Sequence, residues 1–195
     1  MLYQIHRYPA DLIDVVHMEG RRVVIRPVLP QDEQLTVAFF GGLPSGARYD
    51  RFMSPMRHLP PELVKRFTSI DYAQHLALVA EIFEEDRETV VAEARYAVRD
   101  GIEAEFAVSV DPAWQGKGLA SQLLSKLLCR AAQAGLQRVV GETLATNAAM
   151  QHLARKAGFT VRRSLEVSGV LILQKDLSLA PSADCGCQPL PAHAA

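Results

Sequence analysis

The stretch from Val108 to Leu124, which reads VSVDPAWQGKGLASQLL, most constrains what this chain can fold into. An alternating apolar run ends at Val110, Asp111-Pro112 interrupts it, and apolar residues then recur at helical spacing. The segment between them, Gln115–Ala120, holds two glycines and an alanine, which leave backbone N–H groups open to a ligand. Because the first N–H groups of a helix bind anions, the stretch predicts a strand, a loop and a helix start that hold a phosphate-bearing cofactor.

Three known phosphate-binding loops are compatible with glycines in this position, and spacing separates them. A Walker loop needs Gly-Lys-Ser/Thr, whereas Gly116-Lys117-Gly118 is followed by Leu119. A dinucleotide-binding loop needs a third glycine or alanine where this chain has Ser121, and no strand-borne acid follows at the expected distance. The remaining pattern, Gln-x-x-Gly-x-Ala at 115–120, resembles the pyrophosphate loop of the GNAT N-acetyltransferases, which use acetyl-CoA.

The sequence downstream of this loop strengthens the resemblance. Gly135–Leu144 reads as a turn and a strand, Asn147 precedes a short helical pattern, and Gly158-Phe159 ends it. GNAT members show the same order. The resemblance implies that Asn147 binds the pantetheine arm of acetyl-CoA, although an Asn at this position is also a good helix N-cap.

The resemblance also implies the residues that bind the cofactor. Lys117 would approach a phosphate or point to solvent, and a backbone N–H of the strand before the loop would polarise the thioester carbonyl. The predicted cofactor-binding residues are Val108, Val110, Gln115, Gly116, Lys117, Gly118, Leu119, Ala120, Ser121 and Asn147.

The order of the expected elements is that of the GNAT fold. Strands are expected at 21–27, 75–83, 89–98, 102–110 and 135–144 and between 160 and 175, and helices after Asp32, at Pro60-Pro61, after Gly118 and after Asn147. This order predicts an α/β fold with a mixed, mostly antiparallel central sheet flanked by helices. The expected domains are an N-terminal arm (1–19), the acetyltransferase domain (20–176) and a disordered tail (177–195).

The N-terminal half carries a narrower resemblance, to the acetyltransferase domain of bacterial protein lysine acetyltransferases. The matching residues are Tyr8-Pro9, Leu12, Gly20, Ile25-Arg26-Pro27, Asp32, Phe39-Phe40, Arg51-Phe52 and Ile70-Asp71-Tyr72. Those enzymes often carry this domain behind an acyl-CoA-synthetase-like domain. They modify target lysines such as one in acetyl-CoA synthetase. The resemblance implies a protein lysine as the acceptor of the acetyl group.

Acetyl transfer to a lysine amine requires a general base, because an amine with a reference pKa near 10.4 is protonated at neutral pH. In the alternating strand at 102–110, Glu103 and Glu105 share a face with Ala107 and Ser109. The related lysine acetyltransferases resemble this Ala-Glu-Phe-Ala pattern and use its Glu as the base, which implies Glu105. The alternative is that both acids are simply solvent-exposed side chains on an open face of the sheet.

The sequence offers more than one candidate for the group that protonates the leaving thiolate. Many GNAT enzymes have a Tyr four residues before the Gly of Gly-Phe, where this chain has Ala154. Either no acid is needed, or Ser109, Tyr72 or His152 supplies the proton. A structural pair between Arg51 and Asp71 is expected, with a place at the acceptor entrance as the alternative.

Composition excludes other classes of function. The net charge of −1 predicts no nucleic-acid or membrane partner, and no signal peptide or 18-residue apolar run is present, so a cytoplasmic location is expected. Cys129 is expected to be buried, and Cys185, Cys187 and His193 have irregular spacing, so no metal site is expected. The remaining alternatives are a small-molecule amine acetyltransferase and a non-catalytic acyl-CoA-binding regulatory module.

Overall fold

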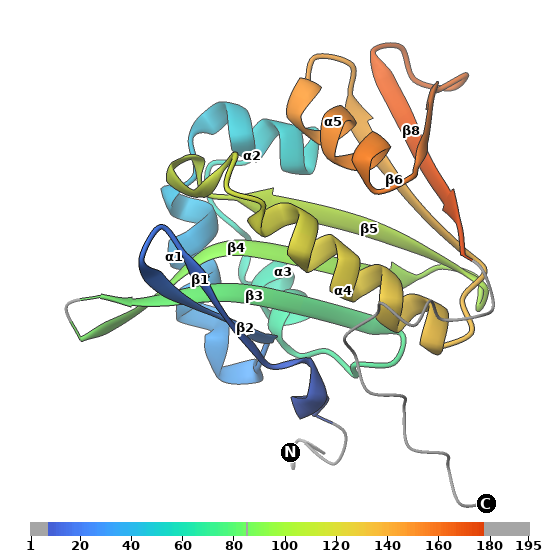
Figure 1. The fold of residues 1–195 in the computed structure, drawn as a ribbon. Coiled ribbons are helices and arrows are strands. Elements are labelled where there is room, and N and C mark those ends of the chain that lie inside the picture. Colours follow the sequence, from blue (N-terminus) through green and yellow to red (C-terminus); the bar gives the residue numbers. More distant parts are fainter. Residues whose placement is uncertain (1–7, 85, 178–195) are drawn as a thin grey trace, which may run out of the picture.

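The computed structural model describes residues 8–84 and 86–177, which form one eight-stranded sheet with helices on both faces (Figure 1). The strands are β1 (Asp14–Met18), β2 (Arg21–Pro27), β3 (His75–Glu84), β4 (Arg87–Val98), β5 (Glu103–Val110), β6 (Arg138–Leu144), β7 (Thr160–Arg163) and β8 (Val170–Asp176). Their order in the sheet is β1-β2-β3-β4-β5-β6-β8-β7. Among these strands, β5 and β6 run parallel and every other neighbouring pair is antiparallel, which confirms the predicted mixed sheet.

Five α-helices flank the sheet in the described ranges. They are α1 (Glu33–Gly42), α2 (Ser45–Phe52), α3 (Pro61–Thr68), α4 (Leu119–Gln133) and α5 (Ala148–Lys156). Three short 3₁₀ segments, η1 (Ala10–Leu12), η2 (Pro30–Asp32) and η3 (Pro112–Trp114), connect them to the strands. Helix α4 crosses one face of β3, β4 and β5, while α1 and α3 lie behind the sheet and α5 packs beside β7 (Figure 1).

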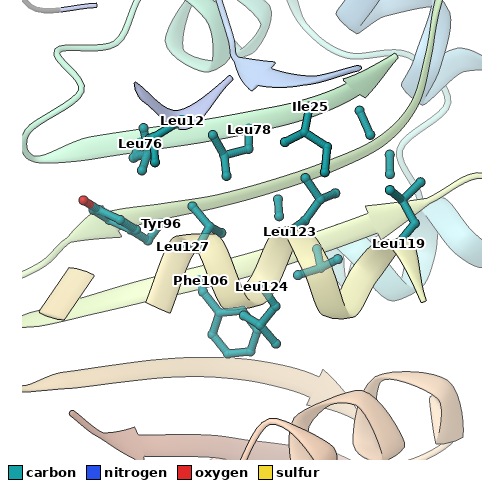
Figure 2. Close-up of a cluster of buried hydrophobic side chains, with 14 of the residues drawn as sticks. Leu12, Ile25, Leu76, Leu78, Tyr96, Phe106, Leu119, Leu123, Leu124 and Leu127 are labelled. Carbon is teal, nitrogen blue, oxygen red and sulfur yellow. The ribbon is translucent and has the colours of Figure 1, made fainter. Parts of the chain in front are cut away.

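The main core lies between α4 and the sheet. The apolar stripe of α4, which includes Leu119, Leu123 and Leu127, meets the alternate residues of β3 to β5 that point the same way (Figure 2). Tyr96 and Phe106 on β4 and β5 close this layer. The helical spacing seen in the sequence therefore corresponds to a buried face, which fixes where the helix begins relative to the end of β5.

A second core lies on the opposite face of the sheet, and it is aromatic. Phe39 and Phe40 of α1 and Phe67 of α3 pack on Ala77 and Val79 of β3. The ring centroids of Phe40 and Phe67 are 5.7 Å apart. This layer holds α1 and α3 against the sheet and leaves α2 to approach β5 and β6.

The parallel pair β5 and β6 separates along its length, and this separation positions the site. The ladder joins Glu103–Glu105 to Arg138–Val140 and stops there, so the later halves of the two strands diverge (Figure 1). Gly141 begins the diverging half of β6. A Cβ on Gly141 would lie 2.6 Å from the ring of Phe106, so only glycine lets that ring lie against β6.

Two elements lie where the sequence pattern did not place them. Strand β1 pairs with β2, so the sheet begins at Asp14, inside the expected N-terminal arm. Helix α2 was not expected, because Pro44 and Pro55 on either side of it and Gly46 in its first turn are typical of a loop. The expected tail lies almost entirely outside the described residues.

Candidate active site

A cavity of about 450 Å³ opens where β5 and β6 diverge. Its walls come from the second half of β5, the loop and helix start after it, the end of α1 with α2, the diverging half of β6, and α5. Segments far apart in the sequence therefore meet at one place. The cavity connects the glycine-rich loop on one side to α2 on the other, and we call these the donor side and the acceptor side.

The donor side is built from backbone and small residues. Asp111 accepts a hydrogen bond from the backbone N–H of Ala113 at 2.8 Å, and the Gln115 side chain donates to the carbonyl of Val110 at 3.1 Å. These bonds fix the turn that follows β5. Gly118 then adopts a φ of 86° at the N-cap of α4, and no side chain caps that helix. The first N–H groups of α4 are thus available to an anion, and no atom would lie within 4 Å of a Cβ at Gly118.

Most of the predicted cofactor residues border this cavity. Those that line it are Val108, Val110, Gln115, Gly116, Gly118, Leu119, Ala120, Ser121 and Asn147. Lys117 lies outside the lining, because its ammonium group pairs with Glu19. Asn147 also caps α5, since its side-chain oxygen accepts the N–H of Met150 at 3.0 Å. The two readings of Asn147, as a helix cap and as a cavity residue, are therefore compatible.

The predicted base, Glu105, lies on β5, two residues before Ala107, the first cavity-lining residue of its strand face. Its side chain is 55% exposed and one carboxylate oxygen is 3.9 Å from Nε of Arg99. Ala107 and Ser109, which share its strand face, line the cavity, whereas Glu105 itself does not. Glu103 lies further along the strand and pairs with Arg138 at 3.6 Å. Of the two acids, Glu105 is the nearer along β5 to the lining residues.

The candidate proton donors differ in their surroundings. Tyr72 donates its hydroxyl to the carbonyl of Val28 at 2.8 Å, and burial raises its pKa to about 12. His152 is exposed and lines the cavity, and Ala154 is fully buried. Ser109 also lines the cavity and is 9% exposed. Within the described residues, its hydroxyl has no hydrogen-bond partner.

Thr143 on β6 is a cavity residue that the sequence pattern did not reveal. It is 1% exposed, and in the described structure its hydroxyl also lacks a hydrogen-bond partner. A buried hydroxyl without a partner costs free energy, so Ser109 and Thr143 would be satisfied by a polar ligand between the diverging strands. The thioester and amide groups of an acyl-CoA supply such partners. The residues present therefore fit this cofactor.

Behind the acceptor side lies a buried charged cluster that sequence reasoning missed. Glu93 and Arg95 lie on the face of β4 that Ser109 and Ala107 share, and they form an ion pair. Arg95 also donates to Nε2 of His75 at 3.2 Å, and its guanidinium lies 3.7 Å from the centre of the Phe67 ring. Burial, together with the positive charge of Arg95, lowers the pKa of His75 to about 4.

The expected pair between Arg51 and Asp71 does not form. One carboxylate oxygen of Asp71 accepts backbone N–H groups of residues 73–75 at 2.9 to 3.0 Å. Arg51 instead lines the cavity beside Asp50. Its guanidinium lies over the rings of Phe52 and Phe67, at 5.0 and 5.6 Å. The alternative in which Arg51 flanks the acceptor entrance thus agrees with the geometry.

Two findings concern metal ligands and membrane-spanning helices in the described residues. Residues 8–84 and 86–177 contain no group of three or more His, Cys, Asp or Glu side chains that could hold a metal ion. Cys185, Cys187 and His193 lie outside the described residues. In the part of the chain that the structure describes, no helix combines the length and the apolar character needed to cross a membrane.

Comparison with known proteins identifies the family. Residues 48–159 match the Acetyltransferase (GNAT) family. "Acetyltransferase PA5475" of Pseudomonas aeruginosa is 31% identical over 79% of this chain and 83% of its own length. "Acetyltransferase Pat" of Mycolicibacterium smegmatis is 33% identical over 81% of this chain, which spans 46% of that protein.

A solved structure agrees with these relatives. The GNAT domain of S. lividans PAT superimposes with a TM-score of 0.80 and 31% identity, covering 88% of this chain and all of that domain. The resemblance to the acetyltransferase domains of protein lysine acetyltransferases is thereby confirmed. The site has an open, glycine-rich helix start beside two diverging strands, and the sequence matches the family over more than half of the chain. This chain therefore belongs to the GNAT family of acetyltransferases, which are acyltransferases that use acetyl-CoA as cosubstrate.

Proposed function

We propose that the protein transfers the acetyl group of acetyl-CoA to the side-chain amine of a lysine in a protein acceptor. The observation that supports this most is that one continuous cavity joins the donor loop to the acceptor side. A donor entering along the loop and an amine entering past α2 would meet beside Ala107 and Ser109 of β5. The relationship to Pat-type domains supports a lysine as the acceptor.

In this proposal the chain contributes a binding loop, an oxyanion donor and a base. The N–H groups at the start of α4, from Leu119 to Ser121, hold the diphosphate, and Asn147 contacts the pantetheine arm. Acetyl-CoA supplies the activated thioester. A backbone N–H between Val108 and Val110 donates to the carbonyl oxygen as charge develops there.

Glu105 takes the proton that the lysine ammonium must lose before its nitrogen can attack. The new bond joins that nitrogen to the acetyl carbon, and the bond from carbon to sulfur breaks. The leaving group is a thiolate of ordinary pKa near 8.5, which departs without an obligatory acid. Ser109 is placed to donate a hydrogen bond to it, since its hydroxyl is buried in the lining and unpaired within the described residues.

The experiment measures thiol release from acetyl-CoA together with the mass of the acceptor. Acetyl-CoA synthetase, or a peptide around its active-site lysine, should gain an acetyl group faster than polyamines or aminoglycosides do. Rapid turnover of one small amine with no transfer to any protein lysine would instead assign the protein to small-molecule acetylation. Binding of acetyl-CoA without thiol release for any acceptor would indicate a regulatory module.

A further inference from the structure

Arg51 has unused hydrogen-bonding capacity in the wall of the cavity. It lies on α2 and lines the acceptor side. In residues 8–84 and 86–177, its guanidinium forms neither a hydrogen bond nor an ion pair, and it lies over the rings of Phe52 and Phe67. A guanidinium carries five N–H donors in a flat fork, and those of Arg51 have no protein acceptor among the described residues. A planar ligand with two acceptor atoms would pair with them.

The two phenylalanine rings hold this guanidinium in place. Its carbon lies 5.0 Å from the ring centre of Phe52 and 5.6 Å from that of Phe67, within the range of cation–π attraction. The same Phe67 ring contacts Arg95 at 3.7 Å, so it is itself fixed. Stacking leaves the edge of the fork, which carries the N–H groups, free to meet a planar anion.

Two acids near Arg51 have other cationic partners. Glu93 is paired with Arg95, and Glu105 lies beside Arg99. Burial is the main reason that the pKa of Arg51 falls to about 10, and the positive charge of Arg95 contributes to the decrease. The group is still charged at neutral pH, and an incoming negative charge would be favoured beside it. Asp50, the adjacent residue, lines the same cavity with the opposite charge.

We propose that Arg51 binds a carboxylate of the acceptor, so that the enzyme selects amines that carry a carboxylate a short distance away. The inference rests on the proposed function and defines its substrate class. A bidentate bond from Arg51 to the carboxylate would orient the acceptor while its ammonium group points toward Glu105 and Asp50. The carboxylate belongs either to an Asp or Glu beside the target lysine or to a free amino acid.

The test compares two peptides that differ in one group, a lysine flanked by Glu and the same lysine flanked by Gln. With the wild-type enzyme, kcat/KM for the Glu peptide should exceed that for the Gln peptide by about 10- to 100-fold, the range of a charge-assisted hydrogen bond. In Arg51→Gln this ratio should fall to about 1, and in Arg51→Lys it should be intermediate, because the charge remains without the fork. Acetyl-CoA-induced thermal stabilisation checks that each variant is folded.

Arg57→Gln is the matched control, since Arg57 is an exposed arginine between α2 and α3 and its loss should leave the ratio as in wild type. Equal use of the two peptides by the wild-type enzyme, or an unchanged ratio in Arg51→Gln, would show that Arg51 does not bind a carboxylate of the peptide. Transfer to free amino acids alone, abolished in Arg51→Gln, supports the carboxylate contact and rejects the protein acceptor. If Arg51→Gln changes only the preference between succinyl-CoA and acetyl-CoA, the carboxylate lies on the acyl chain and the proposal is wrong.

Discussion

The donor side of the cavity is formed mainly by backbone groups, whereas the acceptor side is formed by side chains. The donor side uses backbone N–H groups at the start of α4, with glycines at 116 and 118 that have positive φ. The acceptor side presents the side chain of Arg51 on α2, with Glu93 and Arg95 of β4 behind it and Glu105 of β5 outside the lining. One side therefore depends on the local course of the chain, and the other depends on how distant segments pack.

This difference has consequences for substitution. A backbone site tolerates changes of side chain as long as the turn forms, and it is sensitive to any residue that cannot take a left-handed conformation or that fills the cradle. A side-chain site is lost by single conservative changes such as Glu to Gln. We therefore expect donor-side and acceptor-side variants to separate cofactor binding from turnover and from stability.

The largest expected effect concerns the proposed base. Glu105→Gln should lower kcat by roughly 10² to 10⁴ at neutral pH, because the amide keeps the size of the side chain and loses the basic oxygen. Affinity for acetyl-CoA should hold, and higher pH should partly restore turnover by supplying neutral amine. Steady-state kinetics between pH 7 and 10 measure both. Glu103→Gln is the control on the same strand face, and normal turnover in both variants would place the base elsewhere.

The buried pair behind the acceptor side should dominate stability. Glu93→Gln leaves the buried charge of Arg95 without its partner, which should lower the free energy of unfolding by about 3 to 5 kcal/mol in urea titrations. Stabilisation by acetyl-CoA should persist in this variant. Glu84→Gln removes the exposed partner of Arg21 and should cost less than about 1 kcal/mol. Equal losses in the two variants would mean that the buried pair does not stabilise the fold.

The donor loop should affect binding and leave the acceptor side intact. At a hundred times its dissociation constant, acetyl-CoA should stabilise the wild-type protein by about 2.7 kcal/mol. Gly118→Val should abolish this stabilisation, because a side chain would occupy the open cradle. Gly101→Val is matched for strain, since Gly101 has a φ of 87° in the turn between β4 and β5. If the melting temperature of Gly118→Val rises with acetyl-CoA as in wild type, the loop is not the diphosphate site.

The smallest expected effect is a dependence of stability on pH that originates at His75. Its pKa is about 4 in the folded state against an ordinary value of 6.5, lowered by burial and then by Arg95, with Arg66 adding to the effect and Glu93 and Asp71 opposing it. Between pH 6.5 and 4 the unfolded chain binds a proton that the folded chain does not. The stabilisation is therefore complete above pH 6.5 and is lost as the pH falls through this window.

The loss from His75 should amount to about 1 to 3 kcal/mol by pH 4. Thermal melts between pH 4 and 8 should show a steeper decrease for the wild-type protein than for His75→Gln, which cannot titrate at this position. Parallel curves for the two proteins would show that His75 is not the origin of the dependence.

Much of the fold follows from local patterns. The helical apolar spacing after Gly118 predicts α4, which begins at Leu119, and the alternation at 102–110 predicts β5, which runs from Glu103. Helix α2 could not be predicted in this way, because its apolar residues are few and its flanks hold Pro44 and Pro55. It forms because packing against β5 and β6 stabilises it, and a sequence pattern does not contain that contact.

By itself, the sequence determined the donor side of this protein, because a strand, a tight turn with glycines and a helix start are consecutive in the chain and fix their own geometry. Only the tertiary structure decided the acceptor side. In the folded protein Thr143 lies in the cavity wall and Glu93 pairs with Arg95. Asp71 accepts backbone N–H groups of the turn that follows it, and Arg51 lines the cavity. Side-chain pairing depends on which segments come into contact across the sheet, and the packing of the whole domain determines those contacts.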